Sequence, residues 1–185
     1  MKSDRYIIAI MLAVWWVTAV SSCYAASLRE DYRQMVVERQ VLEKERRQHE
    51  AASRKLSAKR RKLHSELMQC ISATWVPELE DSFRVVHNMR NELEEDRTAL
   101  IRLREQLDIV RKEMEEIRAA IEAKYRKKSR SANYENEFRQ YMAVLKEQYF
   151  KRMEIELFTG YREYLVKVEQ YLQIIGTCIH ECRGE

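Results

Sequence analysis

The chain has 185 residues, of which 35% are charged and 45% hydrophobic, and its formal net charge is +4. Three glycines and one proline are too few for the many turns that a β-rich or α/β fold of this size needs. Interspersed charges of both signs are instead typical of long solvent-exposed helices or coiled coil. The small net charge does not by itself indicate a polyanionic partner, and no nucleic-acid partner is expected.

Residues 1–26 have the layout of an export segment. Lys2 and Arg5 precede an apolar run at 7–20, and small residues follow it. A basic start, an apolar centre and a small-residue end are typical of a secretory signal peptide. We therefore expect residues 27–185 to lie in the periplasm or outside the cell.

Three fates of this segment fit the sequence. A signal peptidase could cut after Ala25. The stretch Val20-Ser21-Ser22-Cys23 resembles the bacterial lipobox, which makes Cys23 a candidate for lipidation. Alternatively the segment stays as a membrane anchor, because residues 6–26 come close to the roughly 20 residues that span a bilayer.

The middle stretch, at about 78–127, carries the clearest helical pattern. Apolar residues occupy ten of twelve positions reached by alternating steps of three and four: Val86, Met89, Leu93, Leu100, Leu103, Leu107, Val110, Met114, Ile117 and Ile121. Such a seam over more than five heptads predicts a helix that packs along its whole length. Asp96 interrupts the seam, either to fix the register or as a solvated gap.

The first stretch, at about 27–73, has a narrower apolar stripe. Apolar or small residues recur at every seventh position: Leu28, Met35, Leu42, His49, Leu56, Leu63 and Cys70. The other seam position holds Arg39, Arg46, Ser53 and Arg60, so this helix should be the most loosely packed. We expect it to end before Pro77, because the residue before a proline is pushed out of helical geometry.

The third stretch, at about 134–175, is apolar over a wide face. This width indicates either a central helix of a bundle or a surface that binds a partner. The aromatic residues that could form such a surface are Tyr141, Tyr149, Phe158, Tyr164 and Tyr171. Gly160, inside this helix, marks a close helix contact or a bend, and a short C-terminal tail should follow Ile175.

The three stretches predict an all-α fold with an up-down-up three-helix bundle. The basic break at 127–133 is short, so the helices on either side should be antiparallel. In an alternative arrangement, the second and third helices form a hairpin and the first is a stalk toward the membrane.

Cys70, Cys178 and Cys182 are disulfide candidates, because an exported protein meets an oxidising environment. In an up-down-up bundle the first and third helices are parallel, and Cys70 and Cys178 lie at similar distances from the helix starts. We therefore predict a Cys70–Cys178 bridge, with Cys70–Cys182 as the second choice. The pair Cys178 and Cys182 could also form a metal or redox site, but no second cluster of ligands accompanies it, so no metal or cofactor is expected.

A basic run has no acidic residue between Ala51 and Ser65; it comprises Arg54, Lys55, Lys59, Arg60, Arg61 and Lys62. It is either a solvated helix face or a site for anions such as surface polysaccharide or lipid head groups. Glycine-rich phosphate loops and the GxSxG and HExxH motifs are absent from the sequence. We expect no catalytic residues.

These observations predict an exported, non-enzymatic coiled-coil protein that acts through protein–protein contacts, as a spacer, adaptor or assembly component of a cell-envelope or secretion system. In layout and length alone, the chain is similar to the inner-membrane component of phage spanin pairs, to helical periplasmic chaperones and to helical minor-pilin components of type IV secretion. The alternative function is a periplasmic holdase-type chaperone or a binder of anionic envelope polymers. Expected partners are other proteins, including a second copy of the chain, and the membrane through the N-terminal segment.

Overall fold

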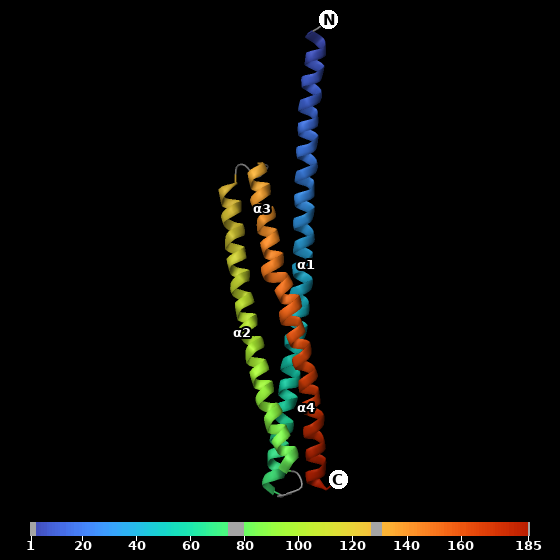
Figure 1. Cartoon of the computed structure of the whole chain (residues 1–185), viewed down its shortest axis with the longest axis vertical. Coiled ribbons are helices and arrows are strands. Elements are labelled where there is room, and N and C mark those ends of the chain that lie inside the picture. Colours follow the sequence, from blue (N-terminus) through green and yellow to red (C-terminus); the bar gives the residue numbers. More distant parts are fainter. Residues whose placement is uncertain (1–2, 74–79, 127–130, 185) are drawn as a thin grey trace.

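The computed structural model describes the backbone of residues 3–73, 80–126 and 131–184, and side chains for 28–72, 80–126 and 131–184. Three long helical rods run alongside one another (Figure 1). The first is α1 (Ser3–Ala73) and the second is α2 (Glu80–Lys124). The third rod, residues 132–183, consists of α3 (Ala132–Leu145), η2 (Lys146–Phe150), η3 (Met153–Phe158) and α4 (Thr159–Arg183). This arrangement confirms the predicted all-α, up-down-up three-helix bundle.

The third rod is longer than the sequence pattern predicted. It begins at Ala132, where the side chain of Ser131 accepts a hydrogen bond from the backbone N–H of Tyr134 (3.2 Å). It continues through Gly176 to Arg183, and Gly184 ends it with a left-handed φ of 69°. The prediction of a tail after residue 175 is therefore wrong: Gly176 lowers helix propensity, whereas Gly184 supplies the conformation that terminates a helix. The predicted break at Pro77 lies outside the described residues.

Helix α1 begins at Ser3, crosses the expected boundary at residue 26 without a backbone break, and extends beyond the α2–α3 hairpin (Figure 1). The apolar run at 7–20 and Cys23 lie outside the residues whose side chains are described. Within the described part of the chain, no helix is long and apolar enough to span a membrane.

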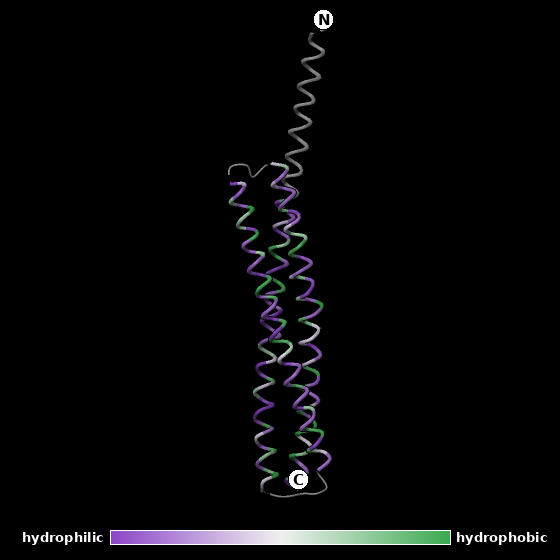
Figure 2. The backbone as a smooth tube through the Cα atoms, turned by 60° about the vertical axis from the view of Figure 1, so that its left-hand side comes forward, coloured by the Kyte–Doolittle hydropathy of each residue, from purple (hydrophilic) through white to green (hydrophobic). Residues whose placement is uncertain are grey.

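The predicted seam of α2 is buried. Its buried residues recur at every seventh position: Val86, Leu93, Leu100, Leu107, Met114 and Ile121. The alternating hydropathy of the rods is visible in Figure 2. At the other seam position Met89, Leu103 and Val110 pack partly against the core, whereas Ile117 is 43% exposed. Helix α2 therefore buries one residue per heptad fully and one partially.

The third rod carries the buried aromatic residues of the described core. It packs against both α1 and α2, whereas α1 and α2 approach each other less closely. Its two π-helical segments widen the buried face, because a π turn brings extra residues to the same side of the helix. As a result both Tyr149 and Phe150 are buried, as are both Leu157 and Phe158.

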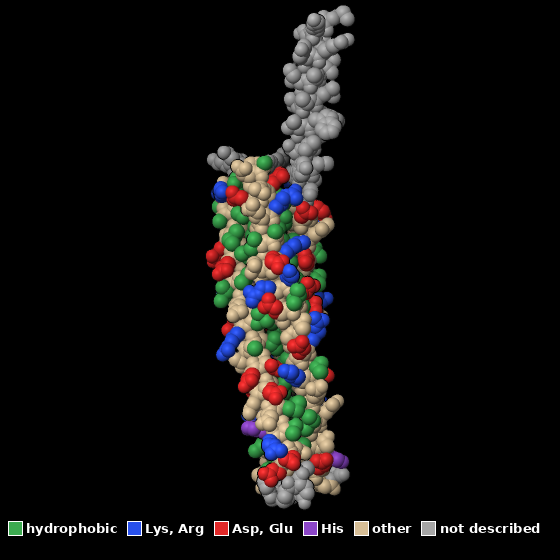
Figure 3. All heavy atoms as spheres, viewed as in Figure 1, with side chains coloured by type: hydrophobic (Ala, Val, Ile, Leu, Met, Phe, Trp, Pro, Cys, Tyr) green, Lys and Arg blue, Asp and Glu red, His purple; other side chains and the backbone are tan. Residues whose placement is uncertain are grey.

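Gly160 marks a close approach of the third rod to α2. A Cβ atom at this position would lie 2.8 Å from Cδ2 of Leu100. The helix continues through Gly160. Of the two interpretations of this glycine, the close helix contact is therefore correct and the bend is not. On the outside of the bundle, acidic and basic side chains are intermixed on the face shown in Figure 3.

Candidate functional site

A ladder of charged side chains joins α1 to α2. The pairs are Arg39–Glu115 (Nη2 to Oε1, 2.6 Å), Arg46–Asp108 (Nη1 to Oδ1, 2.9 Å) and Arg60–Glu94. The arginines occupy heptad positions along α1, and the acids occupy heptad positions along the antiparallel α2. We call these three pairs the arginine ladder. Because α1 and α2 do not pack closely, only long side chains such as arginine can join them.

The ladder explains the polar seam of the first helix. The pattern predicts a weak packing stripe, but Arg39, Arg46 and Arg60 face α2 and form the contact with it. Arg60 is only 4% exposed, so this charge is buried and held by Glu94. The sequence signal that could have identified the ladder is the matching heptad spacing of arginines in the first helix and acids in the second.

The ladder shifts the pKa values of its acids. The hydrogen bond from Arg39 holds the pKa of Glu115 below its usual value. For Glu94, partial burial raises the pKa, but the hydrogen bond and the positive charge of Arg60 outweigh burial and the net pKa is lowered. Both carboxylates are therefore better acids in the folded protein than in the unfolded chain.

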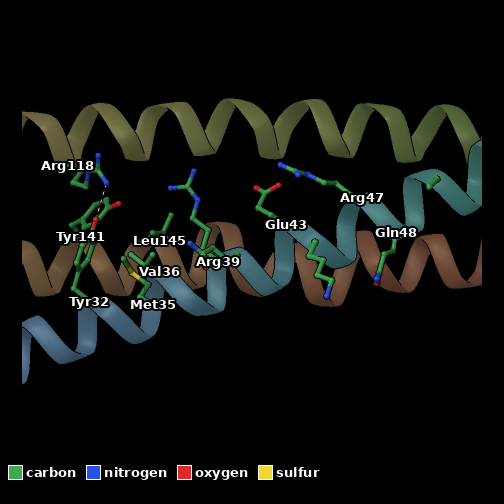
Figure 4. A pocket seen from close by; sticks show the side chains of 13 residues that line it. Tyr32, Met35, Val36, Arg39, Glu43, Arg47, Gln48, Arg118, Tyr141 and Leu145 are labelled. Carbon is green, nitrogen blue, oxygen red and sulfur yellow. Dashed lines mark hydrogen bonds between the residues drawn. The ribbon is translucent and has the colours of Figure 1, made fainter.

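A groove of about 760 Å³ opens between the rods near the hairpin end (Figure 4). Its apolar part includes Met35, Val36, Tyr141 and Leu145, and its cationic residues are Arg39, Lys44, Arg47 and Arg118. Arg118 donates a hydrogen bond to the hydroxyl of Tyr32 at one end (3.0 Å). Lys44 and Arg47 form no ion pair with any described residue, so the groove offers apolar surface together with positive charge.

The far end of the bundle carries a disulfide between Cys70 and Cys182, with Cα atoms 6.3 Å apart. This corrects the predicted Cys70–Cys178 pairing and matches the second choice. Cys178 remains a buried thiol, and burial raises its pKa. A disulfide at this position is compatible with an oxidising, exported location.

The prediction that Cys70 and Cys178 lie at the same level of the bundle is correct, but the prediction that Cys178 faces Cys70 is wrong. Tyr164 contacts Ser57, and Tyr171 contacts His64, so residues about 107 apart lie at the same level of α1 and the third rod. This offset places Cys178 beside Cys70. However, Cys178 is a buried free thiol, and Cys182, one turn further along, forms the bond to Cys70 of α1.

The predicted basic run does not form one face. Arg60 points inward to Glu94 and is buried. The other five residues, Arg54, Lys55, Lys59, Arg61 and Lys62, are exposed. Arg54 lies 3.9 Å from Glu50, and Lys62 lies 3.8 Å from Glu66. The run as a whole is thus divided between the α1–α2 contact and the solvent.

The aromatic residues proposed as a partner surface are all in the core. Tyr141, Tyr149, Phe158, Tyr164 and Tyr171 are each at most 5% exposed. Their hydroxyls are satisfied within the bundle where they meet α1: Tyr149 donates to Glu43, and those of Tyr164 and Tyr171 lie 3.2 Å from Ser57 Oγ and His64 Nδ1. Of the two interpretations of the wide apolar face, the central helix is therefore correct and the partner surface is not, because α1 and α2 together cover this face of the third rod.

Among the described residues, no three histidine, cysteine or acidic side chains gather as a metal site would require. Comparison of the chain with protein-family models, with curated proteins and with solved structures finds no match.

Proposed function

We propose that this chain is an exported, non-enzymatic coiled-coil protein that acts through contacts with other proteins, as a rigid spacer or adaptor in a cell envelope or secretion system. The observation that carries the proposal is the form of the bundle. Helix α2 alone has 45 residues, a length of about 68 Å at 1.5 Å per residue, and its seam is buried from Val86 to Ile121. A rod of this kind holds two partners at a fixed separation.

Two further features support a mechanical role. The Cys70–Cys182 disulfide joins α1 to α4 at the end opposite the hairpin, which resists separation of the rods under load. Helix α1 continues beyond the hairpin at the other end (Figure 1). In a form that retains the N-terminal segment, this extension is a point of attachment to the membrane.

The export element of the proposal is tested by intact mass spectrometry of the protein isolated from its native cells under non-reducing conditions. We expect a polypeptide that is lighter by two hydrogen atoms than its reduced form and that has either lost its first 25 or so residues or gained a lipid. A chain with its full N-terminus can still be anchored, but fully reduced Cys70 and Cys182 would contradict export.

The contact element is tested by photo-crosslinking in cells. A photoreactive residue is placed in turn at exposed apolar positions toward each end of the bundle, such as Val37 and Ile117 near the hairpin and Met68 and Val85 near the disulfide. A spacer that holds two partners should give discrete crosslinked products at both ends, with a different partner at each. Absence of crosslinks from every position would contradict a role in protein contact.

The groove favours a second candidate function, a holdase-type chaperone. Its apolar part and its cationic residues would suit an unfolded segment with apolar and acidic side chains. In that case Val36→Asp should abolish suppression of aggregation of a model outer-membrane protein, whereas the exposed control Val37→Asp should not.

A further inference from the structure

The arginine ladder lacks one rung. Midway between the Arg46–Asp108 and Arg60–Glu94 pairs, the heptad positions are Ser53 on α1 and Ile101 on α2. Neither side chain is long enough to bridge the two helices. A cavity of about 220 Å³ lies there instead, and its lining includes Glu50, Arg54, Arg97, Leu100, Arg104 and Tyr161.

Positive charge dominates this cavity, which has three guanidinium groups and one carboxylate. Arg104 forms no ion pair with any described residue. Arg97 lies 3.4 Å from Glu94, which already accepts from Arg60, and Arg54 lies 3.9 Å from Glu50. The arginines of the cavity are therefore only partly neutralised by the protein.

Tyr161 adds an unused hydrogen-bond donor. Its side chain is 5% exposed, and its ring stacks on His49 with centroids 5.8 Å apart. Tyr161 lines the cavity, and its hydroxyl forms no hydrogen bond with a described residue, unlike those of Tyr149, Tyr164 and Tyr171. The neighbouring Gly160, in contact with Leu100, lets the third rod approach α2 closely enough to bring this tyrosine to the cavity. This hydroxyl does not belong to the fully buried unpaired polar atoms of the described residues, so it is open to a ligand that enters the cavity.

We propose that the missing rung of the ladder is a binding site for a phosphate-type oxyanion, which replaces the absent acid and bridges α1 to α2. Guanidinium groups bind phosphate oxygens through paired N–H donors, and a tyrosine hydroxyl supplies a further donor. Glu50 opposes the anion and sets a modest affinity. The ligand is a phosphomonoester or phosphodiester, carried either by a soluble polymer or by a lipid head group. This site does not depend on the proposed spacer role.

The test is isothermal titration calorimetry on the oxidised full-length protein at constant ionic strength in chloride. The probes are inorganic phosphate, tripolyphosphate and vesicles that contain phosphatidylglycerol. Arg104→Gln should weaken binding roughly tenfold, the effect of losing one charge-assisted contact. Arg102→Gln is the matched control, because it removes the same charge from an exposed position two residues away and should leave binding unchanged.

Two further variants should change the affinity for phosphate in opposite directions, as a specific site requires. Tyr161→Phe removes only the hydroxyl and should weaken binding several-fold without loss of stability. Glu50→Gln removes the opposing charge and should tighten binding. Circular dichroism of each variant checks that the helices are intact.

The probes distinguish the two sources. Binding of phosphate or tripolyphosphate that depends on Arg104 supports the site with a soluble ligand. Binding to vesicles alone, with the same dependence, supports the site with a lipid head group. If no probe binds, or if Arg102→Gln and Arg104→Gln lose affinity equally, the proposal is overturned.

Discussion

The Arg60–Glu94 pair should respond asymmetrically to the loss of each partner. The Arg60 side chain is 5% exposed and that of Glu94 is 45% exposed. Replacing Glu94 leaves a buried guanidinium whose Nη1 atom already has no hydrogen-bond partner. Replacing Arg60 with methionine removes that charge and leaves a carboxylate that solvent and Arg97 can still satisfy.

The magnitudes follow from burial. Removing one partner of a buried ion pair costs about 3–5 kcal/mol, because the other charge stays uncompensated. Glutamine keeps a carbonyl acceptor, so we expect Glu94→Gln to lower the free energy of unfolding by about 2–3 kcal/mol. Apolar replacement of a buried charge is often neutral or stabilising, so Arg60→Met should change the free energy of unfolding by less than about 1 kcal/mol.

The assay is urea unfolding followed by circular dichroism, with both single variants and the double variant. The double variant should resemble Arg60→Met, because Glu94 has no buried charge to compensate once Arg60 is gone. Glu30→Gln is the matched control, since the Arg33–Glu30 pair is exposed (71% and 54%) and should contribute less than about 0.5 kcal/mol. If Arg60→Met destabilises as much as Glu94→Gln, the reasoning from burial is refuted.

Three further predictions concern other parts of the bundle. Gly176→Ala should stabilise the protein by about 0.5–1 kcal/mol through helix propensity, since nothing lies within 4 Å of an added Cβ. Gly160→Ala should give no gain, because its Cβ would meet Leu100 at 2.8 Å. Equal gains of the two variants in thermal unfolding would contradict the close contact. Cys70→Ser should lower the free energy of unfolding by about 2–4 kcal/mol, because the disulfide joins residues 112 apart in sequence. The control Cys178→Ala should leave the sensitivity of unfolding to reductant unchanged. A variant lacking Cys70 that unfolds like the wild type would disprove the bridge. Because the folded protein lowers the pKa values of Glu94 and Glu115, their contribution to stability is fully present above the unfolded pKa of 4.5 and is lost as pH falls through the folded pKa values. The free energy of unfolding, measured as a function of pH, should show this loss below pH 4.5. The loss should be smaller in Glu115→Gln.

The apolar seam of α2 was predicted most accurately from the sequence. The residues from Val86 to Ile121 at heptad spacing are the buried edge of α2, as their periodicity predicted. The end of the third rod was harder to predict, because Gly176 and Gly184 look alike in sequence and only Gly184 adopts a positive φ. The two π-helical segments have no sequence signal that we can identify.

The candidate sites depended on tertiary position, which a single periodic pattern does not specify. The pattern placed Cys70 and Cys178 at one level, but which cysteine faces α1 depends on the rotation of the third rod about its axis. The pattern likewise predicted the wide apolar face of the third rod. It did not specify whether a partner or the chain itself covers this face. The arginine ladder depends on the register of α1 against α2, which the periodicity of each helix does not specify.

The central claim is that three rods lie side by side in one register. Val37, Ile117 and Val144 are exposed, and each belongs to a different rod. The Arg39–Glu115 pair places Val37 level with Ile117, and the offset of the Ser57–Tyr164 contact places Val37 level with Val144.

Spin labels at pairs of these positions, in a protein with Cys23 and Cys178 replaced by alanine and the disulfide retained, give the distances by pulsed electron paramagnetic resonance. All three pairs should lie below about 30 Å, because packed helices have axes about 8–10 Å apart. A control pair at Val37 and Val85 should be separated by about 48 Å along the axis, from the 32 residues between Val85 and Ile117 on α2. A long distance for any of the three level pairs, or a short one for the control, would contradict the bundle.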